Sequence, residues 1–456
     1  MPCCLVGSEM CIRDSSTNTD PHPSMAQPFR LMAHNGELNT DKKNRLSEAA
    51  IARARENNII APKGQSDSCR LDQTLSSRVL DDDLDLVTAV VSMMPPAWEN
   101  DDTLSPDIRS MLEYFSLYEE KNDGPAALIF GDGSTIGARL DRLGLRPLRT
   151  VETTEYLVVM SEAGQIDFGE DSVISRGRIE AGGMLYYDHK EKRSYNTSEA
   201  LKRLAQQRDY ESLVKEARVR IDDLGGDFKN EALDNEIYSG DLSLSGRYVA
   251  YSQNQECFRF MIDPMLATGT EKVSAMGYGN AINALSDNEG GVAKYFSQRF
   301  AQVTNPPLDS IREAEGMTLR VALGAKPNIG LKKSRQIVIQ SPILSPSQML
   351  KIRNQKEVPA AFFNTLFKPV YGDMDSNESA LIAGIDRTCD EVEQFARVSG
   401  GVAILSDREV SRNRASISMT LIVSAINQRL IETGLRLRVS LILSLIHISE
   451  PTRQQG

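Results

Sequence analysis

The chain has 456 residues, a length typical of two or three domains, and 40% of its residues are apolar, which is ample for packed cores. Its formal net charge of −11 argues against nucleic acid and anionic membranes as main partners and favours a soluble, cytoplasmic protein. Its six cysteines and four histidines lack metal-ligand spacing, which argues against a metal site.

The two ends of the chain differ from what lies between them. Residues 1–15 and roughly 443–456 have no periodic relation to the segments they adjoin, and both resemble translated sequencing-adapter sequence. The first lacks the basic and apolar regions of a signal peptide, and the apolar stretch 441–448 is far shorter than the ~20 residues of a membrane helix. We therefore expect both ends to be foreign, and residues 16–442 to be an internal piece of a longer protein.

The most informative segment is residues 26–40, which read AQPFRLMAHNGELNT. Within it, Asn35 and Gly36 can present one side-chain amide and one backbone N–H to the same point. Two such donors are what a tetrahedral oxyanion needs in acyl transfer, and glycine lets a ligand approach the backbone closely. An isolated Asn-Gly pair more often marks a hairpin turn, so the prediction depends on the flanking residues.

Those flanking residues resemble a known family. Residues 26–40, together with STNT at residues 16–19, resemble the glutamine-binding segment of class II glutamine amidotransferases, in the longer form found in the glutamate synthase large subunit. The resemblance implies that Asn35 and Gly36 form the oxyanion hole. It also implies the four-layer αββα sandwich of N-terminal-nucleophile enzymes.

A second candidate site residue follows the motif. Residues 42–57 favour a helix, and the polar loop 64–68 precedes another helical stretch. In this loop Asp67 either caps the helix or, by the resemblance, binds the α-amino group of glutamine, since an ammonium needs a fixed anion. By the same resemblance Thr17 and Asn18 would lie near the substrate carboxylate.

The rest of the first half mixes helices and short strands. Apolar and amphipathic stretches predict helices at 84–94 and 104–120. Strands are expected at 126–130, 135–140, 156–161 and 184–187. Residues 200–224 are charged, helical and without a strong apolar face, so we expect a linker there. By the resemblance, residues 16–225 would be the C-terminal part of the amidotransferase domain.

Three arginines, Arg139, Arg142 and Arg146, lie in or beside residues 141–148, which resemble the family's DRNGLRP motif with Leu143 in place of asparagine. Such a group could form an anion site. The commoner use of neighbouring arginines is to orient loops through pairs with carboxylates, and we favour that interpretation.

Residues 250–315 carry a second block of resemblance, by which residues 226–442 would be the glutamate synthase central domain. Residues 300–313, FAQVTNPPLDSIRE, are close to a signature of the glutamate synthase central domain that other class II amidotransferases do not share. Predicted helices and apolar strands then alternate, at 377–398, 402–405, 417–433 and 437–441. This alternation predicts parallel βα packing.

The resemblance also implies a reaction. An N-terminal cysteine attacks the amide of glutamine, with its own α-amino group as the base. The ammonia travels to a second site, where 2-oxoglutarate is converted to glutamate. That site uses FMN and a [3Fe–4S] cluster, with electrons from ferredoxin or from an NADPH-oxidising small subunit.

The chain departs from the family in three places. No cysteine holds the position of the nucleophile, because Pro2 precedes Cys3. The arginine expected two residues before Ser16, which would bind the substrate carboxylate, falls on Asp14. No FMN domain and no cluster cysteines follow the central region. We therefore expect the whole protein, with the synthase domain of the same polypeptide, to make glutamate, and this chain alone to be inactive and without a cofactor.

Two alternatives stay open. The chain could belong to another class II enzyme, such as a phosphoribosyl-pyrophosphate amidotransferase, but residues 250–440 show neither a phosphoribosyl pocket nor an ATP site. It could also be a non-catalytic scaffold with a decayed amidotransferase fold. The intact HNGE at 34–37 and SDS at 66–68 argue against decay.

Overall fold

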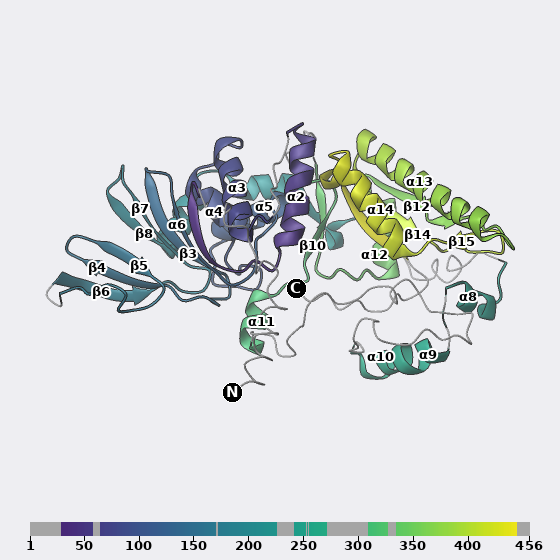
Figure 1. Ribbon diagram of the computed structural model, residues 1–456, viewed down its shortest axis with the longest axis horizontal. Helices are drawn as coiled ribbons and strands as arrows, with labels where there is room; N and C mark the ends of the chain where they lie inside the picture. Colours follow the sequence, from purple (N-terminus) through teal and green to yellow (C-terminus); the bar gives the residue numbers. More distant parts are fainter. Residues whose placement is uncertain are drawn as a thin grey trace. The chain divides into compact units, whose positions relative to one another are not determined.

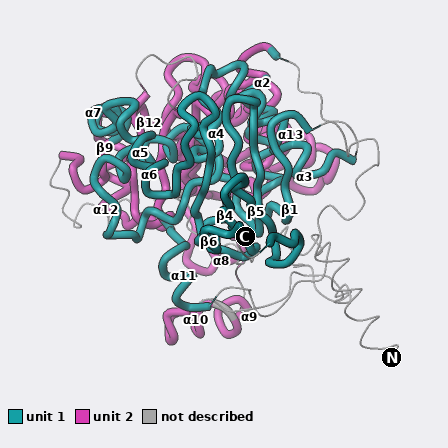
Figure 2. The backbone as a smooth tube through the Cα atoms, turned by 90° about the vertical axis from the view of Figure 1, so that its left-hand side faces the viewer, with its two compact units in different colours: residues 1–52, 57–218, 302–319 teal, residues 53–56, 219–301, 320–456 magenta. Residues whose placement is uncertain are grey.

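A computed structural model describes residues 29–57, 64–169, 172–225, 241–251, 253, 255–270, 309–326 and 334–444. The chain divides into two compact units (Figure 2). The first contains residues 57–218 and 302–319 with the chain up to residue 52, and the second contains the remainder. Within the described ranges, no helix is both long enough and apolar enough to cross a membrane.

The first unit is built on a five-stranded antiparallel sheet with the order β1-β2-β3-β7-β8 (Figure 1). The strands are β1 (Met32–Gly36), β2 (Ala126–Gly131), β3 (Thr135–Leu140), β7 (Met184–Asp188) and β8 (Arg193–Asn196). The strands predicted at 126–130, 135–140 and 184–187 are confirmed. Because β1 lies at the edge, one side of it has no strand neighbour among the described residues.

Helices cover one face of this sheet. They are α3 (Asp67–Leu80), α4 (Leu86–Met93), α5 (Pro106–Tyr118), α6 (Thr197–Ala205) and α7 (Tyr210–Ala217), and α2 (Asp41–Ala54) precedes them in the chain. All eight residues of α4 are buried, as expected for a helix that is apolar on every side. Buried side chains of α3, α4 and α5 pack with Leu128, Phe130 and Met184 of the sheet in one core.

The linker expected at 200–224 is wrong. Leu201 and Leu204 of α6 and Tyr210 and Val214 of α7 are buried, and α6 and the start of α7 belong to the same core as the sheet. The helical conformation is interrupted between α6 and α7, so each helix has its own short apolar face and its own cap. Treating the whole range as a single helix mixes two helical registers and hides both faces.

The other face of the five-stranded sheet packs against a smaller antiparallel sheet with the order β5-β4-β6. Its strands are β4 (Arg149–Thr153), β5 (Leu157–Met160) and β6 (Val173–Arg178). Leu148, Val159 and Ile179 meet Ala127 and Ala138 between the sheets. The described residues of this unit therefore provide one helical layer and two sheets of the expected αββα sandwich.

The second unit contains a parallel sheet with the order β12-β14-β16 (Figure 1). Its strands and their connecting helices are β12 (Ala360–Asn364), α13 (Met374–Val398), β14 (Gly401–Ser406), α14 (Met419–Glu432) and β16 (Val439–Ser444). The predicted parallel βα packing is confirmed. β14 is almost wholly buried because it is the central strand and has no solvent face.

The remaining described elements of the C-terminal half include β10 (Val321–Leu323), β11 (Gln336–Ile339), α12 (Pro346–Asn354), α8 (Leu244–Ala250) and α10 (Asp263–Thr268). Most of the signature at 300–313 lies outside the described residues, as do Thr17 and Asn18. Strand β16 runs on through Leu443 and Ser444, which pair with Leu405 and Ser406. The foreign ends remain a prediction.

Candidate active site

Strand β1 carries the predicted oxyanion donors. In its pairing with β2, the Glu37 N–H donates to the carbonyl of Pro125 over 2.9 Å, and the Gly131 N–H donates to the carbonyl of Leu31 over 2.8 Å. Backbone groups alternate in direction along a strand. The N–H of Gly36 therefore points away from β2, to the edge of β1 without a strand neighbour among the described residues.

Asn35 precedes this amide and is exposed, whereas Met32 and Leu38 on the opposite face of the strand are buried. Within the part of the chain that the structure describes, the Asn35 side-chain amide makes no hydrogen bond. Both donors are thus available to a ligand at the edge of β1.

Gly36 is required by close packing against a segment far away in the sequence. A Cβ at this position would lie 1.8 Å from the carbonyl oxygen of Pro125, far inside any van der Waals contact. The pair Asn35-Gly36 ends a strand whose partner is β2, so the hairpin-turn alternative is wrong. Only glycine lets β1 approach Pro125 this closely.

Asp67 is the first residue of α3, and the helix cap is its neighbour. The Ser66 hydroxyl accepts from the Cys69 N–H over 3.1 Å. The Asp67 carboxylate is buried and accepts from the Leu38 N–H (2.9 Å) and the Ser68 N–H (2.7 Å). It therefore connects α3 to the segment that follows β1. Its two oxygens have about four acceptor positions, so the Leu38 and Ser68 N–H groups leave a position for an ammonium donor.

His34 forms a second link between the same two elements. Its Nδ1 shares a hydrogen bond of 2.8 Å with the Ser68 hydroxyl. Burial lowers the pKa of His34, opposed by the Asp67 carboxylate, and the Arg146 and Arg70 guanidinium groups lower it further. The imidazole is therefore neutral at neutral pH, and it adds no cation beside Asp67.

We expect this burial to make stability depend on pH. Between the ordinary pKa of 6.5 and the lowered pKa of His34, the unfolded chain binds a proton that the folded chain does not. The free energy of unfolding should therefore fall as pH drops below about 6.5. Urea unfolding of the His34→Gln variant should show a shallower fall. A His189→Gln control, at an exposed histidine, should match the unmodified chain, and equal slopes in all three would contradict the assignment.

The sequence did not predict several residues that hold the site in place. Asp72 on α3 accepts from the backbone N–H groups of Arg30, Leu31 and Met32 over 2.9–3.1 Å, which holds the start of β1. Arg70 donates to Asp41 over 2.7 Å. Both are buried. A sequence signal existed for Arg70, because polar residues recur at 67, 70, 74 and 78 on a helix that must bury that face, but Asp72 lies outside this pattern.

The three arginines near the DRNGLRP-like motif have different surroundings. Arg142 pairs with Asp123 over 2.6 Å, as the carboxylate interpretation predicts. Arg139 is fully buried, donates only to the Met94 carbonyl among the described residues, and has no carboxylate partner there. For Arg139 that interpretation is wrong, because the side chain points into the helix-covered core. Burial lowers the pKa of Arg139 to about 9.

Comparison with known families assigns both halves of the chain. The family model for class II glutamine amidotransferases matches residues 7–213, and the model for the glutamate synthase central domain matches residues 246–453. This chain is glutamate synthase large-subunit-like. The range matched by the amidotransferase model falls mainly in the first unit, and the parallel sheet of the second unit lies within the range matched by the central-domain model.

Curated glutamate synthases align along almost the whole chain. The ferredoxin-dependent enzyme of Oryza sativa subsp. japonica is 33% identical over 454 residues, which cover 94% of this chain and 27% of that protein. The ferredoxin-dependent enzyme of Spinacia oleracea is also 33% identical, with the same coverage. The NADH enzyme of Schizosaccharomyces pombe is 30% identical over 94% of this chain and 21% of its own length. The chain thus spans about a quarter of these relatives.

The described residues do not provide the ligands of an iron–sulfur cluster. Cys69, Cys257 and Cys389 are free thiols, and no three or more His, Cys, Asp or Glu side chains in the described ranges gather around a possible metal position.

Proposed function

We propose that this chain is the glutamine-recognising part of a glutamate synthase, which hydrolyses glutamine and passes ammonia to 2-oxoglutarate to form glutamate. The observation that carries the proposal is the set of hydrogen bonds between α3 and the residues at the end of β1. There the Gly36 N–H and the Asn35 amide lie at the end of β1, and Asp67 accepts from the N–H of Leu38, two residues after that strand ends.

In this proposal each group has one role. Asp67 holds the α-ammonium of glutamine. The Asn35 amide and the Gly36 N–H donate hydrogen bonds to the oxygen of the glutamine side-chain amide. As the nucleophile attacks, that oxygen becomes an anion, and the two donors bind it more strongly than the neutral carbonyl. The hydrogen bonds of Asp67 to Leu38 and Ser68 fix the geometry before the substrate arrives.

We propose that this chain does not supply the nucleophile. An N-terminal cysteine needs a free α-amino group as its base, and Cys3, Cys4 and Cys11 are each preceded by other residues. We expect the purified 456-residue chain to release no glutamate from glutamine above a heat-inactivated control, and the full-length synthase recovered from its gene to release it. Hydrolysis by the chain alone would overturn its inactivity.

Replacement of Asp67 tests substrate recognition. In the full-length synthase, Asp67→Asn keeps an oxygen for the Leu38 N–H but removes the charge that binds the ammonium. We expect kcat/KM for glutamine to fall by about 10–100-fold, the usual value of a hydrogen bond to a charged group. Ammonia-dependent turnover should be unchanged. Asp209→Asn, at the exposed cap of α7, is the control. Unchanged kcat/KM in Asp67→Asn would contradict the role.

The central domain favours this proposal over another class II amidotransferase, because its family model covers residues 246–453. The relatives include ferredoxin-dependent and NADH enzymes. We propose a donor of one of these two kinds, acting on the synthase domain that carries FMN and the [3Fe–4S] cluster. The hydrogen bonds of Asp67 with Leu38 and of His34 with Ser68 also argue against a decayed scaffold.

A further inference from the structure

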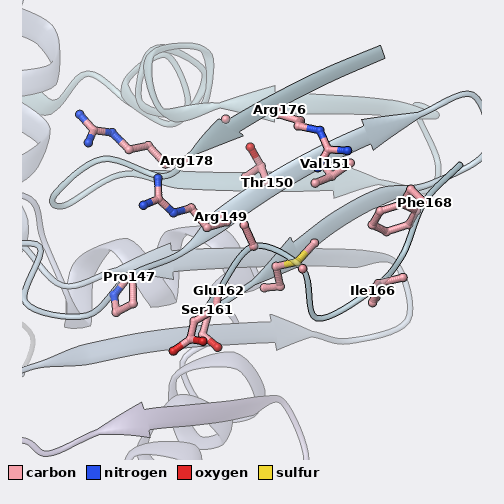
Figure 3. Close-up of a pocket in the computed structure, with 14 residues that line it drawn as sticks. Pro147, Arg149, Thr150, Val151, Ser161, Glu162, Ile166, Phe168, Arg176 and Arg178 are labelled. Atoms are coloured by element: carbon pink, nitrogen blue, oxygen red, sulfur yellow. The ribbon is translucent and has the colours of Figure 1, made fainter. Parts of the chain in front are cut away.

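A cavity of the first unit lies on the small sheet β5-β4-β6, and none of the predicted glutamine-site residues lines it. It has a volume of about 630 Å³ and is bounded by strands β4 and β6 and by the residues that follow β5 (Figure 3). Small-molecule sites usually enclose roughly 300–1,000 Å³, so the cavity is large enough for a metabolite.

Strand register places three arginines on the cavity face of this sheet. Arg149 of β4 lies directly opposite Arg178 of β6, and Val151 lies opposite Arg176. Directly paired residues share a face, and so do residues two apart on one strand. The three guanidinium groups therefore belong to one side of the sheet, and all three residues line the cavity.

These positive charges are poorly compensated. Arg178 forms an exposed pair with Glu180 over 2.9 Å. Among the residues that the structure describes, the side chains of Arg149 and Arg176 have no hydrogen bond or ion pair, and Glu162 is the only acidic residue in the lining. Like charges directly opposite each other destabilise a sheet, and this chain carries a net charge of −11. A bound anion would relieve that repulsion.

The two ends of the cavity differ in chemistry. Figure 3 shows Arg149 and Arg178 at one end, with Phe168 and Ile166 at the other. Ile166 is 49% exposed and Phe168 is half-buried, so both present apolar surface to a ligand. Arg176 lies on the Phe168 side, where a guanidinium can stack on a flat ring. The site thus combines an anion-binding end with a surface for a planar group.

We propose that this cavity binds a nucleoside diphosphate, with the phosphates on Arg149 and Arg178 and the base against Phe168. Phosphate oxygens accept several charge-assisted hydrogen bonds from paired arginines, which an uncharged ligand cannot exploit. The site is separate from the glutamine site, so its occupancy gives the amidotransferase domain a second ligand. The inference does not depend on the proposed function.

Calorimetric titration of the 456-residue chain with ADP, adenosine and inorganic pyrophosphate tests this site. ADP should bind more tightly than either of the other two. Arg149→Gln should weaken ADP and pyrophosphate by about tenfold or more, the cost of a hydrogen bond to a charged group. Phe168→Ala should weaken ADP and leave pyrophosphate unchanged. Arg193→Gln, at an arginine outside the cavity lining, should behave like the unmodified chain.

Three results would overturn the proposal. One is the absence of ADP binding at millimolar concentration. Another is equal ADP affinity in the unmodified chain and in Arg149→Gln. The third is pyrophosphate binding as tight as that of ADP and insensitive to Phe168→Ala, since that describes an inorganic-anion site. Arg149 is exposed and lies opposite Arg178, so its replacement should not lower the melting temperature, and any loss of affinity is then assignable to the site.

Discussion

Asn35→Ala in the full-length synthase is expected to lower glutamine-dependent turnover by about 10²–10³-fold, the usual cost of one oxyanion donor. Asn35 is exposed on β1, and its side chain has no hydrogen-bond partner among the described residues, so the fold should not change. Turnover with ammonia in place of glutamine should persist, because it bypasses the amidotransferase reaction. Steady-state rates with each nitrogen source measure the difference.

The control for this variant is Asn57→Ala, an exposed asparagine just after α2 that should leave both rates unchanged. An equal fall of the glutamine- and ammonia-dependent rates in Asn35→Ala would contradict the assignment. In that case Asn35 would be a structural residue of β1, and the oxyanion would need another donor.

Gly36→Ala is expected to remove glutamine-dependent turnover at least as completely. The new methyl group would overlap the Pro125 carbonyl oxygen, which lies 1.8 Å from its position, and neither can move without the backbone that carries it. Strand β1 must then move away from Pro125 and carry the Gly36 N–H with it. Urea unfolding of the 456-residue chain should show a loss of about 1–3 kcal/mol, as for other overpacked sites.

Gly133→Ala separates this overlap from backbone strain. Gly36 has a positive φ of +156°, and Gly133 has a positive φ of +85°. At Gly133, however, nothing lies within 4 Å of an added Cβ. It should cost about 1–2 kcal/mol through strain alone and leave glutamine turnover unchanged. If Gly36→Ala kept normal glutamine turnover, β1 would tolerate the displacement, and the placement of its N–H would not matter for catalysis.

The sequence predicted those parts of the fold that depend on local patterns. The alternating helices and strands of the parallel sheet follow from apolar runs such as the wholly buried core of β14. Strand β2 and helix α5 likewise lie within a residue or two of their predicted bounds. Residues 200–224 were predicted to be helical, but the buried faces of α6 and α7 were missed because the interruption between the two helices breaks the helical period.

The site depends on contacts between distant segments, which local patterns do not contain. The resemblance singled out Asn35, Gly36 and Asp67, but the need for glycine comes from Pro125, on a segment that joins β1 only in the fold. Asp67 could equally have been a cap by its sequence. Only the structure shows that Ser66 caps the helix and that Asp67 reaches Leu38.

A crystal structure of the full-length synthase with glutamate, the product of glutamine hydrolysis, tests the central claim most directly. We predict that the α-ammonium lies within hydrogen-bond distance of the Asp67 carboxylate. The side-chain carboxylate should accept from the Asn35 amide and the Gly36 N–H. Glutamate bound elsewhere, with Asp67 contacting only Leu38 and Ser68 as it does here, would contradict the account.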